Sequence, residues 1–480
     1  MSDYTPIAEI PKIVASLRTT FRSGHTKPLA FRRHQLHQLA RLAQENADAL
    51  ATAIHLDLGR PKQESIMAEV GAIVERSLIC AEKVGEWVQT EDLEGKVEVW
   101  QRGWRPRVVK EAKGVVLIIA PWNYPLILAL QPLYGAIAAG CCAVIKPSEI
   151  SAHFSSLLAT LLPQYLDTSA YKVVLGGVEE TTELLQVKFD HIFYTGNARV
   201  ARLISLAASH FLTPLTLELG GKSPVLLLPP LSPSSLSLAA KRIIWGKTQN
   251  AGQICVAPDY VLVDPSLRSS FIAEIRTHLQ AFFPEEGGAL KSKDYGRIVS
   301  ESHFGRLTAM LERTRGRVVL GGRWDVQSRG IEPTVVVDVP EGDVLLEDEL
   351  FGPVLPVVEV EGVEGALRYL EDREHPLVIY AFTDGEEVKK RLESHTTSGT
   401  LVFGDTFAQV AINELPFGGV GESGYGRQVL KYSFDNFVYE RGVVDVPFGD
   451  EPVLAMRYPP YTAESLEFFS APLKVDIPRD

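Results

Sequence analysis

The stretch from Gly114 to Ile145, "GVVLIIAPWNYPLILALQPLYGAIAAGCCAVI", contains no charged residue and is long enough for a membrane span. Pro121, Pro125 and Pro132, together with Asn123, interrupt it. Each apolar piece between them has the length of a strand or a short helix. The stretch therefore predicts a buried β-α-β unit and no transmembrane segment.

The alternation of strands and helices extends over most of the chain. From Val115 to Leu219, strand-like runs such as "VVLIIA", "HIFYTG" and "LTLELGG" alternate with helical segments. A second alternating set runs from Ser223 to about Pro416, and the pattern from Ile7 to about Val88 is helical. This alternation is typical of a parallel, doubly wound sheet with helices on both faces. The expected fold class is therefore α/β.

Composition excludes several classes of protein. A chain of 480 residues is expected to form two or three domains, and 45% hydrophobic with 22% charged residues indicates a soluble globular protein. A formal charge of -12 argues against a nucleic-acid partner. Four cysteines cannot form a disulfide framework, and their spacing suggests no metal site. With no secretory signal at the N-terminus, a cytoplasmic location is expected.

Two turns resemble nucleotide-binding sites. In "HIFYTGNARV" an apolar strand ends, turns through Gly196 and Asn197, and enters a helix whose free N-H groups suit a pyrophosphate. In "VIKPSEIS" Lys146 closes a strand, and Glu149 stands where a carboxylate accepts from a ribose 2'-OH and repels a 2'-phosphate, which favours NAD. For the first stretch the structural alternative is an ordinary strand-helix turn. For the second it is Ser148 as the cap of a helix that begins at Glu149. "GVGESG" near the C-terminus matches a dinucleotide motif in letters but lacks the surrounding β-α-β unit.

Cys255, in "QNAGQICVAPDY", is a candidate nucleophile. The preceding glycine allows close backbone approach to a ligand, and the N-H of the cysteine can point at a bound oxygen. No histidine stands in a recognisable Cys-His setting, which weakens a thiol-protease interpretation. A buried cysteine that only fills the core is the alternative.

Glu218 and Asn123 are the other candidates. In "PLTLELGGKSP" Glu218 ends a strand rich in leucine, where desolvation would raise its pKa and suit it to general-base catalysis. In "APWNYP" Asn123 follows a buried strand between two prolines, where its amide can donate to an oxyanion. A solvated edge glutamate and a turn asparagine are the alternatives.

Taken in order along the chain, "APWNYP", "KPSE", "FYTGN", "LELGGKSP", "AGQIC", "EDELFGPVLPV" and "LPFGGVGESGYG" resemble the aldehyde dehydrogenase superfamily, and "RYPPY" resembles its class 3 branch. The resemblance implies NAD(P)-dependent oxidation of an aldehyde, with NAD as cofactor and NADP possible. It assigns Cys255 as nucleophile, Glu218 as general base and Asn123 as oxyanion donor. It also implies a cofactor site without a metal, made of Trp122, Lys146, Glu149, Gly196, Asn197, Glu349 and Phe351.

The resemblance also implies a domain organisation and a homodimer. The expected parts are a Rossmann-like NAD(P)-binding domain, a second α/β catalytic domain, a small β oligomerisation arm and a C-terminal tail. Their predicted boundaries are 1–95 with 115–219, 220–416, 96–114 with 428–446, and 447–480. An exposed hairpin is expected over 96–114, and the polar ending "SAPLKVDIPRD" predicts a soluble enzyme.

Three departures from the family pattern concern the substrate. Ile254 precedes the cysteine where many relatives carry Thr, "GRQVLKYSF" lacks the His-Gly pair of class 3 members, and Gly404 stands where Asn is common. Apolar residues near the site favour a medium or long aliphatic, aromatic or terpenoid-derived aldehyde. A CoA-acylating dehydrogenase, a thiol esterase and a non-catalytic binding or structural homologue are the competing hypotheses.

Overall fold

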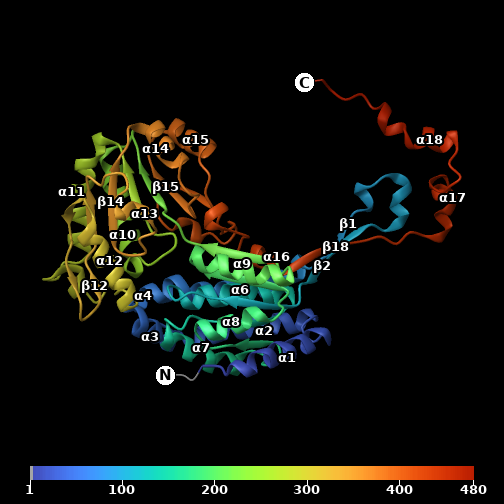
Figure 1. Ribbon diagram of the computed structural model, residues 1–480, viewed down its shortest axis with the longest axis horizontal. Coiled ribbons are helices and arrows are strands. Elements are labelled where there is room, and N and C mark those ends of the chain that lie inside the picture. Colours follow the sequence, from blue (N-terminus) through green and yellow to red (C-terminus); the bar gives the residue numbers. More distant parts are fainter. Residues whose placement is uncertain (1–3, 480) are drawn as a thin grey trace. The chain divides into compact units, whose positions relative to one another are not determined.

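The computed structural model describes residues 4–479 and contains two compact units. The first comprises residues up to Trp87 and Ala112–Val438, and the second comprises Val88–Glu111 and Tyr439 onward. Each unit has its own sheet or sheets (Figure 1).

A six-stranded sheet with the order β17-β7-β6-β3-β4-β5 forms one half of the first unit. All neighbouring strands are parallel except the β17 and β7 pair. The strands are β3 (Val115–Ile119), β4 (Cys142–Lys146), β5 (Tyr171–Val173), β6 (His191–Gly196), β7 (Leu215–Leu219) and β17 (Gly424–Tyr425). The strand order reverses between β3 and β6, and the crevice beyond their carboxyl ends is where doubly wound sheets bind ligands.

Helices cover both faces of this sheet, so its strands are buried on both sides. One face is covered by α6 and α7, with α2 and α5 packed outside them, and the other by α1, α8 and α9. Their bounds are α1 (Ile10–Arg22), α2 (Leu29–Glu45), α3 (Ala47–Leu58), α4 (Lys62–Ser65), the π-helix η2 (Ile66–Val70), α5 (Gly71–Trp87), α6 (Pro125–Ala139), α7 (Ala152–Tyr165), α8 (Val178–Gln186) and α9 (Ala198–Phe211). The predicted N-terminal helices and the β3-α6-β4 unit are confirmed.

Two local expectations for this half are wrong. Helix α6 continues through Pro132, since the helix is buried along its length and packing offsets the missing N-H. Helix α7 begins at Ala152, three residues after the expected start at Glu149. The intervening residues form a turn in which Ser148 Oγ accepts from the Ile150 N-H at 3.3 Å, while the hydroxyls of Ser151 and Ser155 donate to the Ser148 carbonyl oxygen. Ser148 therefore organises the turn that precedes α7.

A seven-stranded sheet with the order β10-β13-β14-β9-β8-β15-β16 forms the other half of the first unit. Only the β10 and β13 pair is antiparallel. Its strands are β8 (Pro224–Leu227), β9 (Tyr260–Val263), β10 (Arg317–Leu320), β13 (Thr334–Val337), β14 (Val354–Glu359), β15 (Val378–Phe382) and β16 (Thr400–Phe403), beside a small ribbon of β11 (Trp324–Asp325) and β12 (Gly330–Ile331).

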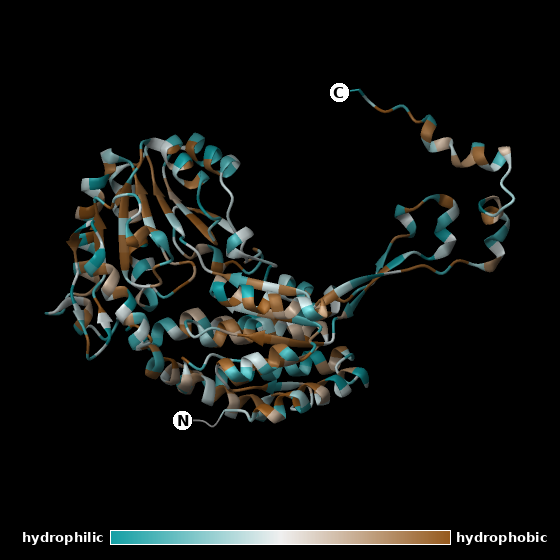
Figure 2. Ribbon diagram, in the orientation of Figure 1, coloured by the Kyte–Doolittle hydropathy of each residue, from teal (hydrophilic) through white to brown (hydrophobic). Residues whose placement is uncertain are grey.

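Alternating side chains divide the core of this half into two layers. Val225 and Leu227 point to the face covered by α10 and α11, whereas Leu226 points to the face covered by α14 and α15. The helices here are α10 (Pro233–Thr248), α11 (Pro265–Phe282), α12 (Glu301–Arg313), α13 (Val344–Glu347), α14 (Gly362–Glu371), α15 (Glu386–His395) and α16 (Lys431–Asn436), of which α16 packs on α6. The strands of both sheets are coloured mainly as hydrophobic in Figure 2, and their apolar side chains are buried. The predicted α/β fold with doubly wound parallel sheets is confirmed.

The second unit is built on a three-stranded sheet with the order β1-β2-β18. Its strands are β1 (Glu91–Asp92), β2 (Arg107–Ala112) and β18 (Val438–Val443), and its short C-terminal helices are α17 (Glu451–Leu454) and α18 (Ala463–Phe469). The hairpin expected over 96–114 is wrong in its first part, because Val99–Trp104 form a 3-10 helix. A capping box between Glu98 and Gln101 and an edge-to-face contact of Trp100 with Trp104 hold this turn.

None of the helices formed by residues 4–479 combines the length and the apolar composition that crossing a membrane requires.

Gly135 in the middle of α6 tests the packing of α6 on α16. A Cβ there would lie 2.7 Å from Ser433 Cβ and 2.8 Å from its carbonyl carbon, so we expect Gly135→Ala to destabilise the protein by about 1–3 kcal/mol. A Cβ on Gly305 in α12 would point into open space, so Gly305→Ala should stabilise the protein by about 0.5–1 kcal/mol through helix propensity. Thermal unfolding of both variants checks the contrast, and stabilisation by both would contradict it.

Candidate active site

Cys255 follows a strained backbone segment at the end of α10. Asn250, Ala251 and Gly252 have consecutive positive φ values of 48°, 51° and 75°. A Cβ on Gly252 would lie 2.3 Å from the carbonyl oxygen of Gly352, so only glycine allows these two loops to meet. The close contact joins the loop that carries Cys255 to the loop that carries Glu349 and Phe351.

Two cavities meet at Cys255. One, of about 570 Å³, lies beyond the carboxyl ends of β3, β4 and β6, at the point where the strand order reverses. The other, of about 440 Å³, is mostly apolar and lies between α5, α6 and the segment from Phe407 to Phe417. Both are lined by Asn123, Leu128 and Cys255. The thiol therefore stands where two bound molecules would touch. A cysteine that only fills the core would not line two cavities.

The surroundings of Cys255 favour the protonated form of its thiol. Burial, followed by the nearby carboxyl groups of Glu349 and Glu218, raises the pKa of Cys255 above its usual range. Hydrogen bonds from the backbone N-H groups of Cys255 and Val256 act in the opposite direction. These two donors face the sulfur, and a bound cation would add to them in favouring the thiolate.

Glu218 lies in β7, where it stands opposite Gly424 of the edge strand β17, and is 3% exposed. Neither of its carboxylate oxygens has a hydrogen-bond partner. Burial raises its pKa well above the usual range, more than the charge of Arg427 and the amide of Gln428 lower it. A buried carboxyl group with both oxygens free and a raised pKa has the properties of a general base, and the solvated-edge alternative does not fit.

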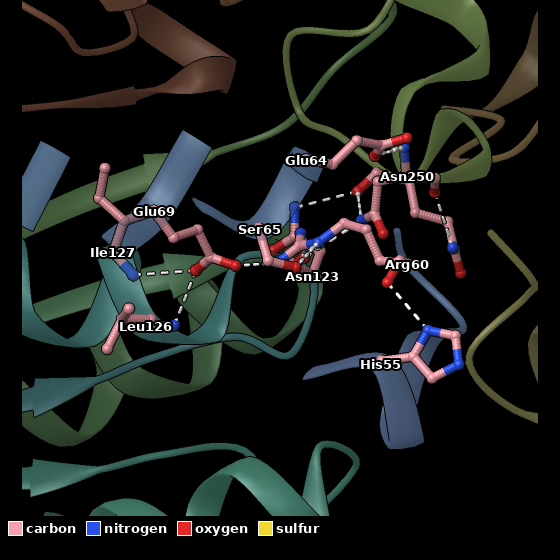
Figure 3. Close-up of polar contacts among 10 residues, drawn as sticks. His55, Arg60, Glu64, Ser65, Glu69, Asn123, Leu126, Ile127 and Asn250 are labelled. Atoms are coloured by element: carbon pink, nitrogen blue, oxygen red, sulfur yellow. Dashed lines mark hydrogen bonds and ion pairs between the residues drawn. The ribbon is translucent and has the colours of Figure 1, made fainter. Parts of the chain in front are cut away.

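Asn123 is held in place by the buried network shown in Figure 3. Its carbonyl oxygen accepts from Arg60 Nη1 at 2.9 Å and from Asn250 Nδ2 at 3.1 Å, and its own Nδ2 donates to the Gln253 carbonyl oxygen at 3.2 Å. One N-H of the Asn123 amide is thereby occupied, which leaves the second for an oxyanion. Asn250, the first residue of the strained segment, donates its backbone N-H to Glu64 at 2.9 Å.

The same network fixes the start of α6. Arg60 forms an ion pair with Glu69 in which both side chains are fully buried. The second oxygen of Glu69 accepts from the backbone N-H groups of Leu126 and Ile127, at 2.8 and 3.0 Å (Figure 3). A carboxylate at a helix N-terminus satisfies free N-H groups and interacts favourably with the helix dipole. Sequence reasoning missed Arg60 and Glu69, because charges within an amphipathic helical region indicate a solvated face.

All seven predicted cofactor residues line the larger cavity together with Cys255, Glu218 and Asn123. Lys146 Nζ contacts Glu149 Oε2 at 2.7 Å, and Asn197 caps α9 by accepting from the Val200 N-H at 2.9 Å. The ring of Trp122 meets those of Phe351 and His303 edge to face, at 5.3 and 5.1 Å. His303 also lines the cavity and was not predicted from the sequence.

The cavity suits a nicotinamide dinucleotide. Gly220 lets the carboxylate of Glu349 approach the backbone, since a Cβ on Gly220 would lie 2.3 Å from Glu349 Oε2. Gly196 likewise makes room for the hydroxyl of Tyr194. Glu349 Oε1 and Thr195 Oγ1 are buried without a partner, so two polar groups stand ready for hydroxyl or amide groups of a ligand. Burial, with Asp259 nearby, raises the pKa of Glu349 to about 8.

Comparisons with known proteins agree with this geometry. The sequence model of the aldehyde dehydrogenase family matches residues 5–443. The "dimeric NADP-preferring" aldehyde dehydrogenase of Canis lupus familiaris is 41% identical, over 95% of this chain and 99% of that protein. Aldehyde dehydrogenase family 3 member A2 of Rattus norvegicus is 42% identical, over 93% of this chain and 90% of that protein. A substrate-bound structure of AldH from Staphylococcus aureus has a TM-score of 0.91 at 34% identity, covering 97% of this chain and 99% of that one.

The chain therefore belongs to the aldehyde dehydrogenase family. Within it the chain lies in the class 3 branch, and it is an NAD(P)-dependent enzyme that oxidises an aldehyde to the carboxylic acid. The resemblance read from the motifs is confirmed. The relatives give no support to the CoA-acylating, thiol-esterase or non-catalytic alternatives.

The Arg60 and Glu69 pair generates a prediction that separates stability from activity. Arg60→Met leaves a buried carboxylate unpaired, so we expect a loss of about 3–5 kcal/mol in the free energy of unfolding. The double variant Arg60→Met, Glu69→Leu should recover part of that stability, yet its kcat should stay low because the donor to the Asn123 carbonyl is gone. Chemical unfolding and steady-state kinetics measure both quantities. Full recovery of kcat in the double variant would contradict a positioning role for Arg60.

Proposed function

We propose that Cys255 is the nucleophile of the oxidation, Glu218 its general base, and Asn123 an oxyanion donor. The observation that carries this proposal is the position of Cys255 where two cavities meet, the larger of which is lined by several charged side chains and the smaller mostly by apolar ones. Glu218 lines the larger cavity, and Asn123 lines both. The aldehyde then enters through the smaller cavity and the nicotinamide dinucleotide through the larger one.

The first step is attack of the Cys255 thiolate on the aldehyde carbon. The aldehyde oxygen becomes an oxyanion, which accepts from the free N-H of the Asn123 amide and from the Cys255 backbone N-H. When bound, the nicotinamide dinucleotide supplies the hydride acceptor of the reaction. After oxidation the acyl group is held as a thioester on Cys255.

The second step is hydrolysis of the thioester. Glu218, with both oxygens free of protein partners, takes a proton from a water molecule that attacks the thioester carbon. The carboxylic acid is released, and Cys255 leaves as a thiolate. Because burial keeps the Glu218 proton affinity high, the residue accepts a proton from water more readily than an exposed glutamate would.

Cofactor binding is proposed for Trp122, Lys146, Glu149, Gly196, Asn197, Glu349 and Phe351. We expect NAD to be preferred and NADP to be accepted. The paired Lys146 and Glu149 support this, since the carboxylate suits a free 2'-OH while the lysine can meet a 2'-phosphate. The canine relative is described as NADP-preferring, which supports acceptance of the phosphorylated form.

An apolar aldehyde of medium or long aliphatic, aromatic or terpenoid-derived type is the proposed substrate. The support is the lining of the smaller cavity by Tyr124, Ile127, Trp245 and Phe407. Two departures from the family pattern, Ile254 and the "GRQVLKYSF" segment, contribute to that lining through Ile254, Gln428 and Val429.

The boundaries predicted for the cofactor, catalytic and arm regions remain part of the proposal.

A homodimer in the cytoplasm completes the proposal. The name of the canine relative includes the word dimeric, and that protein matches this chain over nearly its full length. The four cysteines, Cys80, Cys141, Cys142 and Cys255, are free thiols, as expected in a reducing compartment.

Two variants separate the proposed roles. Cys255→Ala should lose aldehyde oxidation by at least about 10³-fold, because no other group can form the adduct. Glu218→Gln should retain a burst of about one NAD(P)H per site at 340 nm and then turn over at least about 10²-fold more slowly, because deacylation lacks its base. Rapid-mixing absorbance measures the burst. A burst in Cys255→Ala, or full turnover in Glu218→Gln, would contradict the assignments.

The pH dependence follows from the two buried acids. Both Cys255 and Glu218 act in the deprotonated form, and the pKa of each is raised. Raising pH therefore activates the enzyme, and we expect kcat/KM to increase between about pH 6 and 9. In Glu218→Gln the burst rate should keep this rise, since it depends on the thiol. A wild-type rate that falls from pH 7 to 9, while the protein stays folded, would contradict the prediction.

A further inference from the structure

Glu64 is a buried acid that the proposed catalytic steps do not use. It lies in α4 and is 8% exposed. Its Oε2 accepts from the backbone N-H of Asn250 at 2.9 Å, a residue 186 positions further along the chain (Figure 3). Asn250 is the first residue of the strained segment 250–252, which precedes Cys255. Glu64 therefore connects the N-terminal helices to the loop that carries the thiol.

The strained segment depends on contacts of this kind. Left-handed backbone is unfavourable for residues with a Cβ, and both Asn250 and Ala251 have one. The side-chain amide of Asn250 donates to the carbonyl oxygens of Asn123 and Gln253, each at 3.1 Å, and its carbonyl oxygen accepts from Gln253 Nε2 at 2.8 Å. All of these partners are neutral. The acceptor of the Asn250 backbone N-H is the side chain of Glu64, the ionisable group in the set.

The conformation of this segment sets the position of the Cys255 backbone N-H. Gln253, which stands two residues before Cys255, is bonded to Asn250 through both its side chain and its backbone N-H. Its Oε1 accepts from the Val299 N-H at 3.0 Å, and its carbonyl oxygen accepts from Asn123 Nδ2 at 3.2 Å. A change at Asn250 is therefore transmitted to the backbone just before the thiol and to the amide of Asn123.

We propose that Glu64 is a positioning residue, whose ionised carboxylate fixes Asn250 and, through Gln253, the backbone N-H of Cys255 that donates to the aldehyde oxygen. The inference rests on the proposed function of Cys255. Glu64 lines neither of the two cavities, so it acts through Asn250 and does not contact the substrate.

The charge on Glu64 changes near neutral pH. Burial raises the pKa of Glu64 to about 7, and the charge of Asp294 acts in the same direction, while the Asn250 N-H and the charge of Arg60 lower it. The phenol groups of Tyr124 and Tyr295 are also close, and they stay neutral in this range because burial raises the pKa of each above its ordinary value.

Ionisation of Glu64 strengthens its bond to Asn250. A hydrogen bond from an N-H to a carboxylate is stronger than one to a neutral oxygen, and the carboxyl group becomes mostly charged between about pH 6 and 8. The segment before Cys255 is therefore held more firmly at pH 8 than at pH 6. This effect is separate from the ionisation of the thiol and of Glu218.

Glu64→Gln separates the two effects, because the amide keeps an acceptor oxygen but carries no charge at any pH. The measurement is the first-turnover rate of NAD(P)H formation at 340 nm with saturating aldehyde and cofactor. Cys255 titrates in both proteins, so its contribution cancels in the ratio of the wild-type rate to the variant rate. We expect this ratio to be about one at pH 5.5 and to increase to about three- to tenfold at pH 8.5, with a midpoint near pH 7. A ratio that is the same at every pH would overturn the inference, since a purely structural role predicts that result.

Two further variants control this comparison. Glu82→Gln makes the same change at an exposed position of α5 and should give a ratio of one throughout. Asp294→Asn removes a charge that raises the pKa of Glu64, so this variant should be faster than wild type by about twofold near pH 6.5 and equal to it at pH 8.5. If Glu64→Gln fails to fold, Asp294→Asn decides, and rates equal to wild type at every pH would then overturn the inference.

Unfolding measurements test Glu64 without using activity. Its pKa is higher in the folded protein, at about 7, than the ordinary value of 4.5. The proton that the folded state retains stabilises it fully below about pH 4.5, and this contribution is lost as pH increases through 7. The free energy of unfolding of wild type should therefore decrease relative to that of Glu64→Gln between pH 5 and 8. An identical pH dependence would overturn the inference. A wild-type protein that oxidises no aldehyde would instead contradict the proposed function, while the unfolding data would still report the state of Glu64.

Discussion

The buried ion pair of Arg60 and Glu69 is the constraint on which the site depends. Arg60 holds the carbonyl of Asn123, and Glu69 holds the first N-H groups of α6, so one pair fixes both the end of the loop after β3 and the start of the next helix. Asn123 in turn contacts Gln253, two residues before Cys255. A buried ion pair contributes little net stability, but its strict geometry suits the positioning of catalytic groups.

The electrostatics around Cys255 disfavour the charged forms of the acidic groups at the site. The thiol, Glu218 and Glu349 all lie in low-dielectric surroundings, and burial raises the pKa of each. Three carboxyl and thiol groups so close together cannot all ionise cheaply, because each charge disfavours the others. When bound, a positively charged nicotinamide ring would favour ionisation of the thiol, and so would couple cofactor binding to the reactivity of the sulfur.

The two cavities divide recognition between residues of different origin. The larger cavity is lined by residues that stand in the family motifs, such as Lys146 and Glu349. The smaller, apolar cavity includes positions outside those motifs, among them Arg76, Gln428 and Val429. On the proposed function, the larger cavity serves the chemistry common to the family and the smaller one contacts the substrate.

The sequence by itself determined the α/β class, because strands buried on both faces are continuous apolar runs, whereas helices on a solvated surface carry apolar residues on one face only. It also indicated Cys255, Glu218 and Asn123 as candidates, since each stands at a strand end or after a glycine, where local sequence limits the backbone. Local sequence could not find Arg60, Glu69 or Arg76, whose burial depends on partners far along the chain. It also misplaced the start of α7 and the turn at Val99–Trp104, where particular contacts outweigh local propensity. Only the tertiary structure decided that two cavities meet at Cys255, because their lining residues come from strands, helices and loops that no short stretch of sequence contains.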